Sequence, residues 1–309
     1  PYWMLDNYKM SDNTERFTGS FNVKADITDW WWIGYRMGID SYTTENSNRI
    51  GEGAAVKLLW QNGMLSENSL RFQYLSTNLM TNFNKQFGDF NLNLLLGTAT
   101  DDTKTSRNYR YGWNFVIPGF YSFGNIANED KYFVTSESRH RLVGVYGEFR
   151  ADWKNTIFAT VTGRNDWSST LPKANRSFFY PSVSGAIVFS QFLQDRELID
   201  DSFLSFGKLR VSWAKVGKDA GAYVTNTYLG SAATFLNDIT GYGTSWERGN
   251  PILEPEMTES TEIGLELRFF KNRLKLDYAY YTNNSLNQII SPRGPQSTGF
   301  IFCSQNIGD

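Results

Sequence analysis

Three stretches of this sequence place aromatic rings beside amide, carboxylate and guanidinium groups: YRYGWNF at 109–115, NDWSS at 165–169 and YGTSWERGN at 242–250. Aromatic faces stack on sugars or on peptide side chains, and Asn, Asp and Arg form directional hydrogen bonds. The pattern therefore predicts a surface that binds an oligosaccharide or a peptide. The residues expected to contact that ligand are Tyr111, Trp113, Asp166, Trp167, Trp246 and Arg248. An alternative is that these rings only pack the loops together or lie at lipid headgroups.

Signals of catalysis are weak. The only histidine, His140, lies between two arginines at the start of an expected strand, so a His-based zinc site or a Ser-His-Asp triad would depend on this one residue. The glycine pairs at 51–53 and 241–243 precede no helix and are explained as turn glycines. We predict no catalytic residue, no metal site and no cofactor. A pair of glycosidase acids among the 32 Asp and Glu residues stays an open alternative.

Composition narrows the class of protein. The net charge is −2 and no basic stripe is present, so nucleic acid is not expected as a partner. Aromatic residues make up 16% of the chain and include ten Trp, which favour surfaces that are apolar at one end and wet at the other. One cysteine, Cys303, excludes an intrachain disulfide. No apolar run approaches the roughly 18 to 20 residues of a membrane helix.

Alternation of apolar and polar residues dominates the chain and predicts strands with one apolar and one polar face. In 17–27, for example, the apolar residues occupy the odd positions. Leu75 and Leu79 interrupt the expected polar face of one segment. The ten segments run over 17–27, 31–42, 70–82, 89–100, 141–151, 156–165, 181–190, 206–216, 261–270 and 273–283.

The connections between these segments alternate between short and long. Short turns on one side and long loops on the other are typical of antiparallel outer-membrane barrels. We therefore predict an all-β, transmembrane antiparallel β-barrel in a single domain. A medium-length connection at 191–205 is expected to carry a short helix. The long extracellular loops are expected near 43–69, 101–140, 166–180, 217–260 and 284–309. A soluble β-sandwich or propeller would also alternate and is the competing fold.

The block at 163–193, GRNDWSSTLPKANRSFFYPSVSGAIVFSQFL, resembles the barrel signature of SusC/RagA-type TonB-dependent outer-membrane transporters. In that family an Arg-x-Asp-x-Ser-Ser stretch precedes a basic loop and an aromatic-Pro-Ser-x-Ser strand. The matching positions are Arg164, Asp166, Ser168, Ser169, Pro181, Ser182, Ser184, Phe192 and Leu193. The family's next element resembles GKLRVSWAKVGKDAGAY at 207–223, with Ala214 where glycine is more usual.

A second block, at 250–289, resembles the family's NP-x-L-x-PE…EIG-x-E…F-x-NRL-x-x-D-x-x-YY segment. The matching positions are Asn250, Pro251, Leu253, Pro255, Glu256, Glu262, Ile263, Gly264, Glu266, Phe270, Asn272, Arg273, Leu274, Asp277, Tyr280 and Tyr281. The resemblance spans essentially the whole chain.

The resemblance implies a barrel of about 22 strands with an N-terminal plug, of which this chain would supply a middle portion of about ten strands. Unpaired strand edges are untenable in lipid, so the remaining barrel and plug polypeptide must complete it. The family further implies the outer membrane of a Gram-negative bacterium, contact with membrane lipid, a SusD-like lipoprotein lid, TonB acting through the plug region, and an oligosaccharide or peptide substrate.

Two other functions compete with import. One is a secreted soluble β-rich carbohydrate-binding module or glycosidase, in which the aromatic residues form a sugar platform. The other is a passive porin, which would need neither plug nor lid. The sequence does not distinguish glycan from peptide as the substrate.

Overall fold

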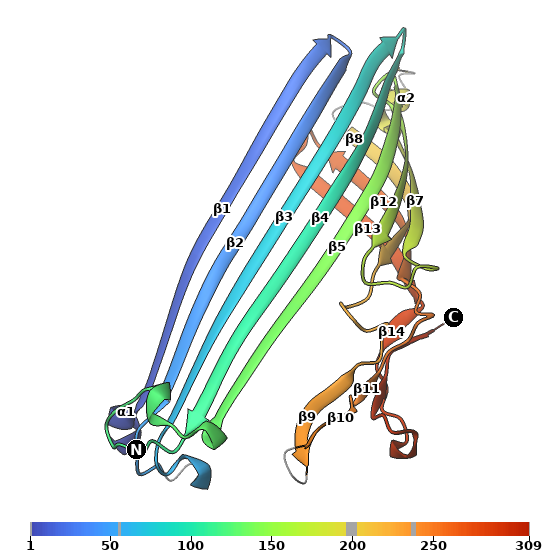
Figure 1. Cartoon of the computed structure of the whole chain (residues 1–309). Coiled ribbons are helices and arrows are strands. Elements are labelled where there is room, and N and C mark those ends of the chain that lie inside the picture. Colours follow the sequence, from blue (N-terminus) through green and yellow to red (C-terminus); the bar gives the residue numbers. More distant parts are fainter. Residues whose placement is uncertain (1, 55–56, 196–202, 236–238, 309) are drawn as a thin grey trace. The chain divides into compact units, whose positions relative to one another are not determined.

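The structure is a computed structural model that describes residues 2–54, 57–195, 203–235 and 239–308. Its main element is a ten-stranded sheet in which β1 to β8 follow one another in chain order and are continued by β12 and β13 (Figure 1). The strands of this sheet are β1 (Tyr8–Thr28), β2 (Trp31–Ile50), β3 (Met64–Phe87), β4 (Phe90–Trp113), β5 (Lys131–Trp153), β6 (Ile157–Ser168), β7 (Ser177–Ile187), β8 (Leu204–Lys218), β12 (Glu256–Phe269) and β13 (Leu274–Leu286). The predicted all-β class and the ten sequential strands are confirmed.

The chain divides into two compact units. The first consists of residues 1–21, 37–77 and 101–140, and the second of residues 22–36, 78–100 and 141–309. The first unit holds the helix α1 (Tyr2–Asn7), parts of β1 to β5 and the connections 51–63 and 114–130. The second holds the rest of β1 to β5 and all of β6, β7, β8, β12 and β13.

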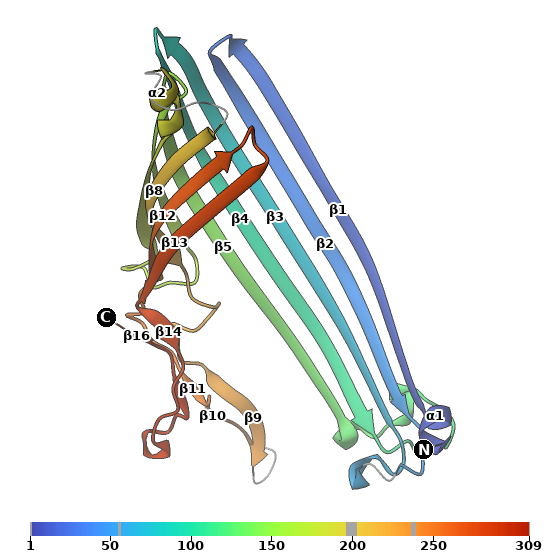
Figure 2. The same ribbon diagram turned by 180° about the vertical axis from the view of Figure 1, so that it is seen from behind.

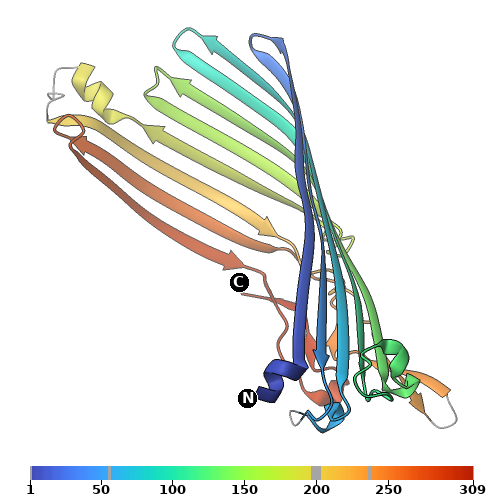
Figure 3. The ribbon, with the colours of Figure 1, turned by 90° about the vertical axis from the view of Figure 1, so that its left-hand side faces the viewer.

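Short connections gather at one end of the sheet in the second unit (Figure 3). They are the turns at 29–30, 88–89, 154–156 and 270–273 and the helix α2 (Phe189–Asp195), which overlaps the start of the connection at 191–205 expected to carry one. Two turns depend on left-handed backbone: Lys154 and Asn155 both have φ of 51°, and Phe270, Lys271 and Asn272 have φ between 54° and 66°.

The strands of the first unit are longer than predicted. β2 continues to Ile50, β3 begins at Met64, β4 continues to Trp113 and β5 begins at Lys131, so most of the loops expected at 43–69 and 101–140 is strand. In these stretches polar residues occupy both faces, so the alternation of apolar and polar residues that predicts a strand is absent. The backbone nevertheless continues to pair with the neighbouring strands. The connection expected at 166–180 is reduced to 169–176.

The later connections also contain short strands, all in the second unit. β9 (Leu229–Phe235) pairs with β10 (Ile239–Thr244), β11 (Glu247–Arg248) with β15 (Phe302–Cys303), and β14 (Gln288–Ile290) with β16 (Gln305–Ile307). Figure 2 shows β8, β12 and β13 side by side, with β14 following the end of β13. The described parts of the segments 217–260 and 284–309 therefore hold three small two-stranded sheets besides the ends of the long strands.

Large apolar side chains cover one face of the strands and are exposed. In the β12–β13 pair, Ile263 lies opposite Tyr280 and Leu267 opposite Leu276. Ile263 is 48% exposed and Tyr280 62% exposed. Such a contiguous bare apolar face is rare on a soluble protein and is normal on strands that face lipid. Leu79 lies on this apolar face too, in a groove with Ile33, so it does not interrupt the polar face as predicted.

Candidate ligand-binding site

A buried carboxylate organises the polar face of the second unit. Asp166 on β6 is only 2% exposed, and its Oδ1 accepts a hydrogen bond from Arg164 Nε at 2.8 Å. The Tyr180 hydroxyl on β7 donates to the other carboxylate oxygen of Asp166. Arg164 also lies 5.9 Å from the centre of the Tyr146 ring, and the Tyr146 hydroxyl donates to Asn78 Oδ1 at 2.8 Å. A charged and aromatic network thus runs across β3, β5, β6 and β7.

Two glycines make room for this network. Gly144 pairs with Asp166 across β5 and β6, and a Cβ atom at Gly144 would lie 2.2 Å from Asp166 Oδ1. A Cβ atom at Gly97 on β4 would lie 2.4 Å from Tyr146 Cζ. Both distances are too short for a real side chain, so glycine is needed at each position to let the polar side chains lie flat against the neighbouring strand.

A cavity of about 400 Å³ lies over this network. Its lining includes Asn78, Tyr146, Glu148, Arg164, Tyr180 and Lys215. These groups offer amide, hydroxyl, carboxylate, ammonium and guanidinium contacts together with two aromatic rings. Such a surface suits a hydrated solute with many hydrogen-bonding groups, such as a sugar or a peptide.

The first unit has a second polar pocket, of about 360 Å³, lined by residues of β1 to β4. Its lining includes Asp12, Asn46, Asn48, Asn68, Arg107 and Tyr109. The Arg107 guanidinium lies 5.5 Å from the centre of the Tyr109 ring and donates to Asn68 Oδ1 at 2.6 Å. These contacts hold the Arg107 head group in place beside an aromatic face.

Tyr109 begins an aromatic ladder along β4. The rings of Tyr109 and Tyr111 stack 6.3 Å apart, and those of Tyr111 and Trp113 are 5.2 Å apart. Trp60 Nε1 donates to the Tyr111 hydroxyl at 2.5 Å, which fixes that ring from the connection 51–63. Within the described residues, the buried Trp113 Nε1 has no hydrogen-bond partner in the protein. The two residues predicted in this stretch therefore lie together.

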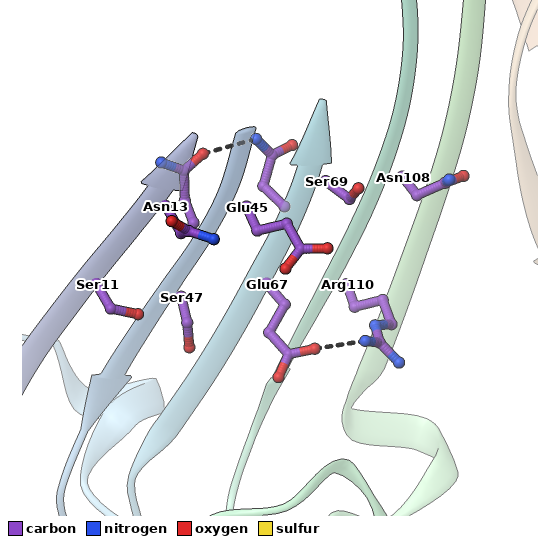
Figure 4. Close-up of a pocket in the computed structure, with 10 residues that line it drawn as sticks. Ser11, Asn13, Glu45, Ser47, Glu67, Ser69, Asn108 and Arg110 are labelled. Atoms are coloured by element: carbon purple, nitrogen blue, oxygen red, sulfur yellow. Dashed lines mark hydrogen bonds and ion pairs between the residues drawn. The ribbon is translucent and has the colours of Figure 1, made fainter. Parts of the chain in front are cut away.

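A third pocket, of about 610 Å³, lies on the opposite face of the same strands (Figure 4). Its polar lining includes Glu45, Glu67, Asn108 and Arg110, and Arg110 Nη2 contacts Glu67 Oε2 at 2.5 Å. On β1 and β2 the lining residues other than Asn46 occupy odd positions, the face on which Phe17 and Ile39 flank Gly19. The pocket in Figure 4 thus lies on the face that carries apolar residues, and the Arg107 pocket lies on the polar face.

Glu52 joins the two connections of the first unit. Its carboxylate accepts hydrogen bonds from the Gly119 amide at 2.8 Å and from the Tyr121 hydroxyl at 3.4 Å. The Arg49 guanidinium lies 4.2 Å from the centre of the Tyr121 ring. Burial and the neighbouring Glu52 carboxylate raise the pKa of Tyr121 above its ordinary value, which keeps this hydroxyl a donor at high pH.

The connections of the second unit are anchored by the NPILEPE segment at 250–256. Leu253 is completely buried against Leu171, Phe178 and Ala220. The Asn175 side chain donates to the carbonyl oxygens of Ile252 and Leu253. The resemblance to a known family had already marked this motif. In the structure its role is to pack three connections into one apolar cluster.

Two carboxylates complete this anchor. Asp219 accepts a hydrogen bond from Ser168 at 2.5 Å, which ties the residues after β8 to the end of β6. Glu256 accepts bonds from the Ile289 amide at 2.8 Å and from Lys218 Nζ at 2.9 Å. Burial opposes ionisation of Glu256, but these two donors outweigh it and hold its pKa below the ordinary value.

The remaining predicted residues fall in two places. Trp246 is 70% exposed, and its carbonyl accepts hydrogen bonds from Ile301 and Phe302, while Arg248 lies in β11. Trp167 is a residue of β6 and not of a loop, paired with Ser177. Because successive strand residues alternate, Trp167 lies on the face opposite Asp166. The structure thus separates these two neighbours.

The sequence prediction did not include Tyr146, Arg107 or Tyr109 in the site. A signal for them was present in the sequence. Each is a large polar or aromatic residue on the polar face of its strand, beside polar residues of adjacent strands. Within the described residues no group of three or more His, Cys, Asp and Glu side chains could hold a metal ion. The described helices are all too short or too polar to cross a membrane.

Comparison with known proteins gives a consistent answer. The family described as "TonB dependent receptor-like, beta-barrel" matches residues 1–309. TonB-dependent receptor P26 of Formosa agariphila is 28% identical over 94% of this chain and 30% of its own length. TonB-dependent receptor SusC of Bacteroides thetaiotaomicron is 30% identical over 55% of this chain and 17% of its own length.

Solved structures show the same fold. The structure of the RagAB peptide transporter matches with a TM-score of 0.89 and 18% identity, covering 100% of this chain and 34% of that chain. The chain therefore spans about a third of the length of that protein and 30% of the P26 receptor. These matches indicate a receptor family and no enzyme family.

Proposed function

Since the chain belongs to the TonB-dependent receptor β-barrel family, whose members lie in the outer membrane of Gram-negative bacteria, we propose that it forms part of the wall of an importer of oligosaccharides or peptides. The observation that carries the proposal is the division of the sheet into two faces. In the second unit one face is apolar and bare and the other bears the Asp166 network, and in the first unit the Arg107 pocket lies on the face opposite Phe17.

The importer works in the manner implied by its relatives. A SusD-like surface lipoprotein covers the entrance, further polypeptide supplies the plug and the rest of the barrel, and TonB acts on that plug. Polar side chains on the inner face hold the solute by hydrogen bonds and ring stacking. The residues proposed to contact it are Arg107, Tyr109, Tyr111 and Trp113 in the first unit and Trp246 and Arg248 in the second.

The proposal includes both substrate classes, oligosaccharides and peptides. One relative is named SusC, and a solved structure with the same fold is described as a peptide transporter, but at 18% identity that likeness shows only the fold. The alternative of a secreted carbohydrate-binding module or glycosidase has no support in these relatives, which are named receptors.

Uptake by cells tests the proposal. In a strain lacking the gene of the full-length receptor, the wild-type gene should restore uptake of a labelled oligosaccharide or peptide mixture. The R107A/Y109A variant should lower uptake at least tenfold, because both groups line the inner pocket. The matched control is N108A/R110A, which alters neighbouring residues on the opposite face and should keep uptake near wild type.

Two results would overturn the proposal. If loss of the receptor leaves uptake of every fraction unchanged, the chain is not part of an importer. If N108A/R110A lowers uptake as much as R107A/Y109A, the assignment of the inner face is wrong. Copurification of a surface lipoprotein with the receptor checks the lid separately.

A further inference from the structure

An apolar groove of about 530 Å³ crosses β2 to β5 in the second unit. Its side chains include Trp31, Ile33, Leu79, Phe83, Leu96 and Val145. Val145 is 51% exposed and Leu79 is 49% exposed, so nothing in the described protein covers this surface. The groove belongs to the apolar face and lies opposite the Asp166 network.

One end of the groove is closed by stacked aromatic rings. Trp31 and Phe83 lie 5.8 Å apart at an angle of 13°, and Trp30 lies 6.1 Å from Phe83. Trp31 Nε1 donates to Thr81 Oγ1 at 2.8 Å, so the polar edge of this indole is satisfied within the protein. The ring faces that remain form a hydrocarbon wall beside the turn at 29–30.

A lysine stands at the aromatic end. Lys85 follows Phe83 by two residues, so both side chains are on one face of β3. The Lys85 ammonium lies 5.5 Å from the ring centre of Trp30 and 5.5 Å from that of Phe87. Cation–π contact with the two rings holds the ammonium in place.

Lys85 differs from two of the three other lysines that lie over aromatic rings in the described part of this unit; the third, Lys208, lies over Phe158. Lys24 contacts Asp26 at 2.6 Å, and Lys154 contacts Asp89 at 3.3 Å. Lys85 has no acidic partner in the part of the chain that the structure describes. A positive charge fixed at the end of an apolar groove, without a protein counter-charge, matches an anionic amphiphile.

We propose that the groove and Lys85 form a binding site for one anionic glycerophospholipid of the periplasmic leaflet, with an acyl chain in the groove and the phosphate at Lys85. The short turns of such barrels face the periplasm, and Lys85 lies near those turns. From Leu79 to Lys85 the strand covers roughly 14 Å along the membrane normal at a tilt of about 45°. Half of the hydrocarbon core is roughly 15 Å thick, so the dimensions agree. The proposal depends on the membrane location of the family and is independent of import.

Native mass spectrometry of the purified full-length receptor tests this site. Phosphatidylglycerol is titrated into the protein in detergent, beside diacylglycerol with the same chains and beside inorganic phosphate. Wild type should retain one phosphatidylglycerol and neither of the other two probes. K85A should bind the lipid about fivefold more weakly, which corresponds to one lysine near a membrane surface. L96W, which fills the groove, should also lose the lipid.

The matched control is K24A, which removes a lysine that lies over Trp32 but is paired with Asp26. It should bind phosphatidylglycerol as wild type does. Equal binding by wild type and K85A overturns the proposal. Equal retention of diacylglycerol would mean unspecific lipid contact, and retention of inorganic phosphate would mean an anion site without an acyl chain; either result also overturns it.

Discussion

At the scale of single residues, Asp166 explains why a polar motif interrupts the alternation of β6. The sequence marked Asp166 as a ligand contact, whereas the structure shows its oxygens engaged by Arg164 and Tyr180. A carboxylate 2% exposed needs such partners, because burial of an unpaired charge is costly. We therefore regard Asp166 as the residue that positions Arg164 and Tyr180 on the inner face.

Replacing Asp166 with Asn should destabilise the barrel by about 2 to 3 kcal/mol, because charge-assisted hydrogen bonds to Arg164 and Tyr180 are weakened. Urea unfolding of the full-length receptor in lipid vesicles measures the change. D26N is the control, since the Lys24–Asp26 pair is exposed and such pairs contribute little. Equal effects of the two variants would show that the buried network does not stabilise the sheet.

At the scale of elements, the connection anchor depends on one leucine. L253A should open a cavity in the cluster with Leu171, Phe178 and Ala220, at a cost of about 2 to 5 kcal/mol. Because the cluster holds connections and not strands, we expect protease cleavage within 219–255 to accelerate while the strands stay resistant. The neighbouring control is I252A, since Ile252 is 76% exposed. If I252A is cleaved as fast as L253A, the anchor lies elsewhere.

The same anchor should weaken in acid. The pKa of Glu256 is below its ordinary value of 4.5 in the folded protein, so its bonds to Lys218 and Ile289 contribute fully above that pH. This contribution is lost as the pH falls through the lowered pKa. Cleavage within 284–290 by an acid protease should therefore accelerate below about pH 4.5 in wild type.

E256Q should already be cleaved faster at pH 6, and its rate relative to wild type should approach one at low pH. E247Q, at an exposed position of β11, is the control and should follow wild type. A constant ratio between E256Q and wild type across the pH range would contradict the role of this carboxylate.

The strands were predictable wherever one face is apolar. The β12–β13 pair was identified to within five residues of its bounds, because Leu265 and Leu267 alternate with Glu266 and Arg268. In 101–113 polar residues occupy both faces, so β4 looked like a loop beyond residue 100. Pairing there depends on backbone hydrogen bonds, which leave no compositional pattern.

The site was predictable only in part, for a related reason. Aromatic and polar residues that follow one another in the sequence indicated Tyr111 and Trp113, whose rings do lie together. The same criterion joined Asp166 to Trp167, which the strand places on opposite faces. Arg107 and Tyr109 were missed, because Asn46 and Asn68, which line the same pocket, come from β2 and β3, far away in sequence.

At the scale of the whole molecule, the chain accounts for about a third of a receptor of this family. As part of the proposed membrane wall, this ten-stranded sheet would need further strands at its edges, because unpaired backbone groups are not stable in lipid. Each unit supplies a polar pocket from its own residues, and the second unit also supplies the apolar face. The central claim is that this sheet separates lipid from a water-filled path.

Site-directed spin labelling of β12 in the full-length receptor, in a Cys303→Ser background and in lipid vesicles, tests that claim most directly. Labels at Ile263, Leu265 and Leu267 should be accessible to oxygen, which concentrates in lipid, and labels at Glu262 and Glu266 to a water-soluble nickel chelate. We expect the two accessibilities to alternate with a period of two residues. High accessibility to the nickel chelate at both sets of positions would mean that both faces meet water, and would contradict a membrane wall.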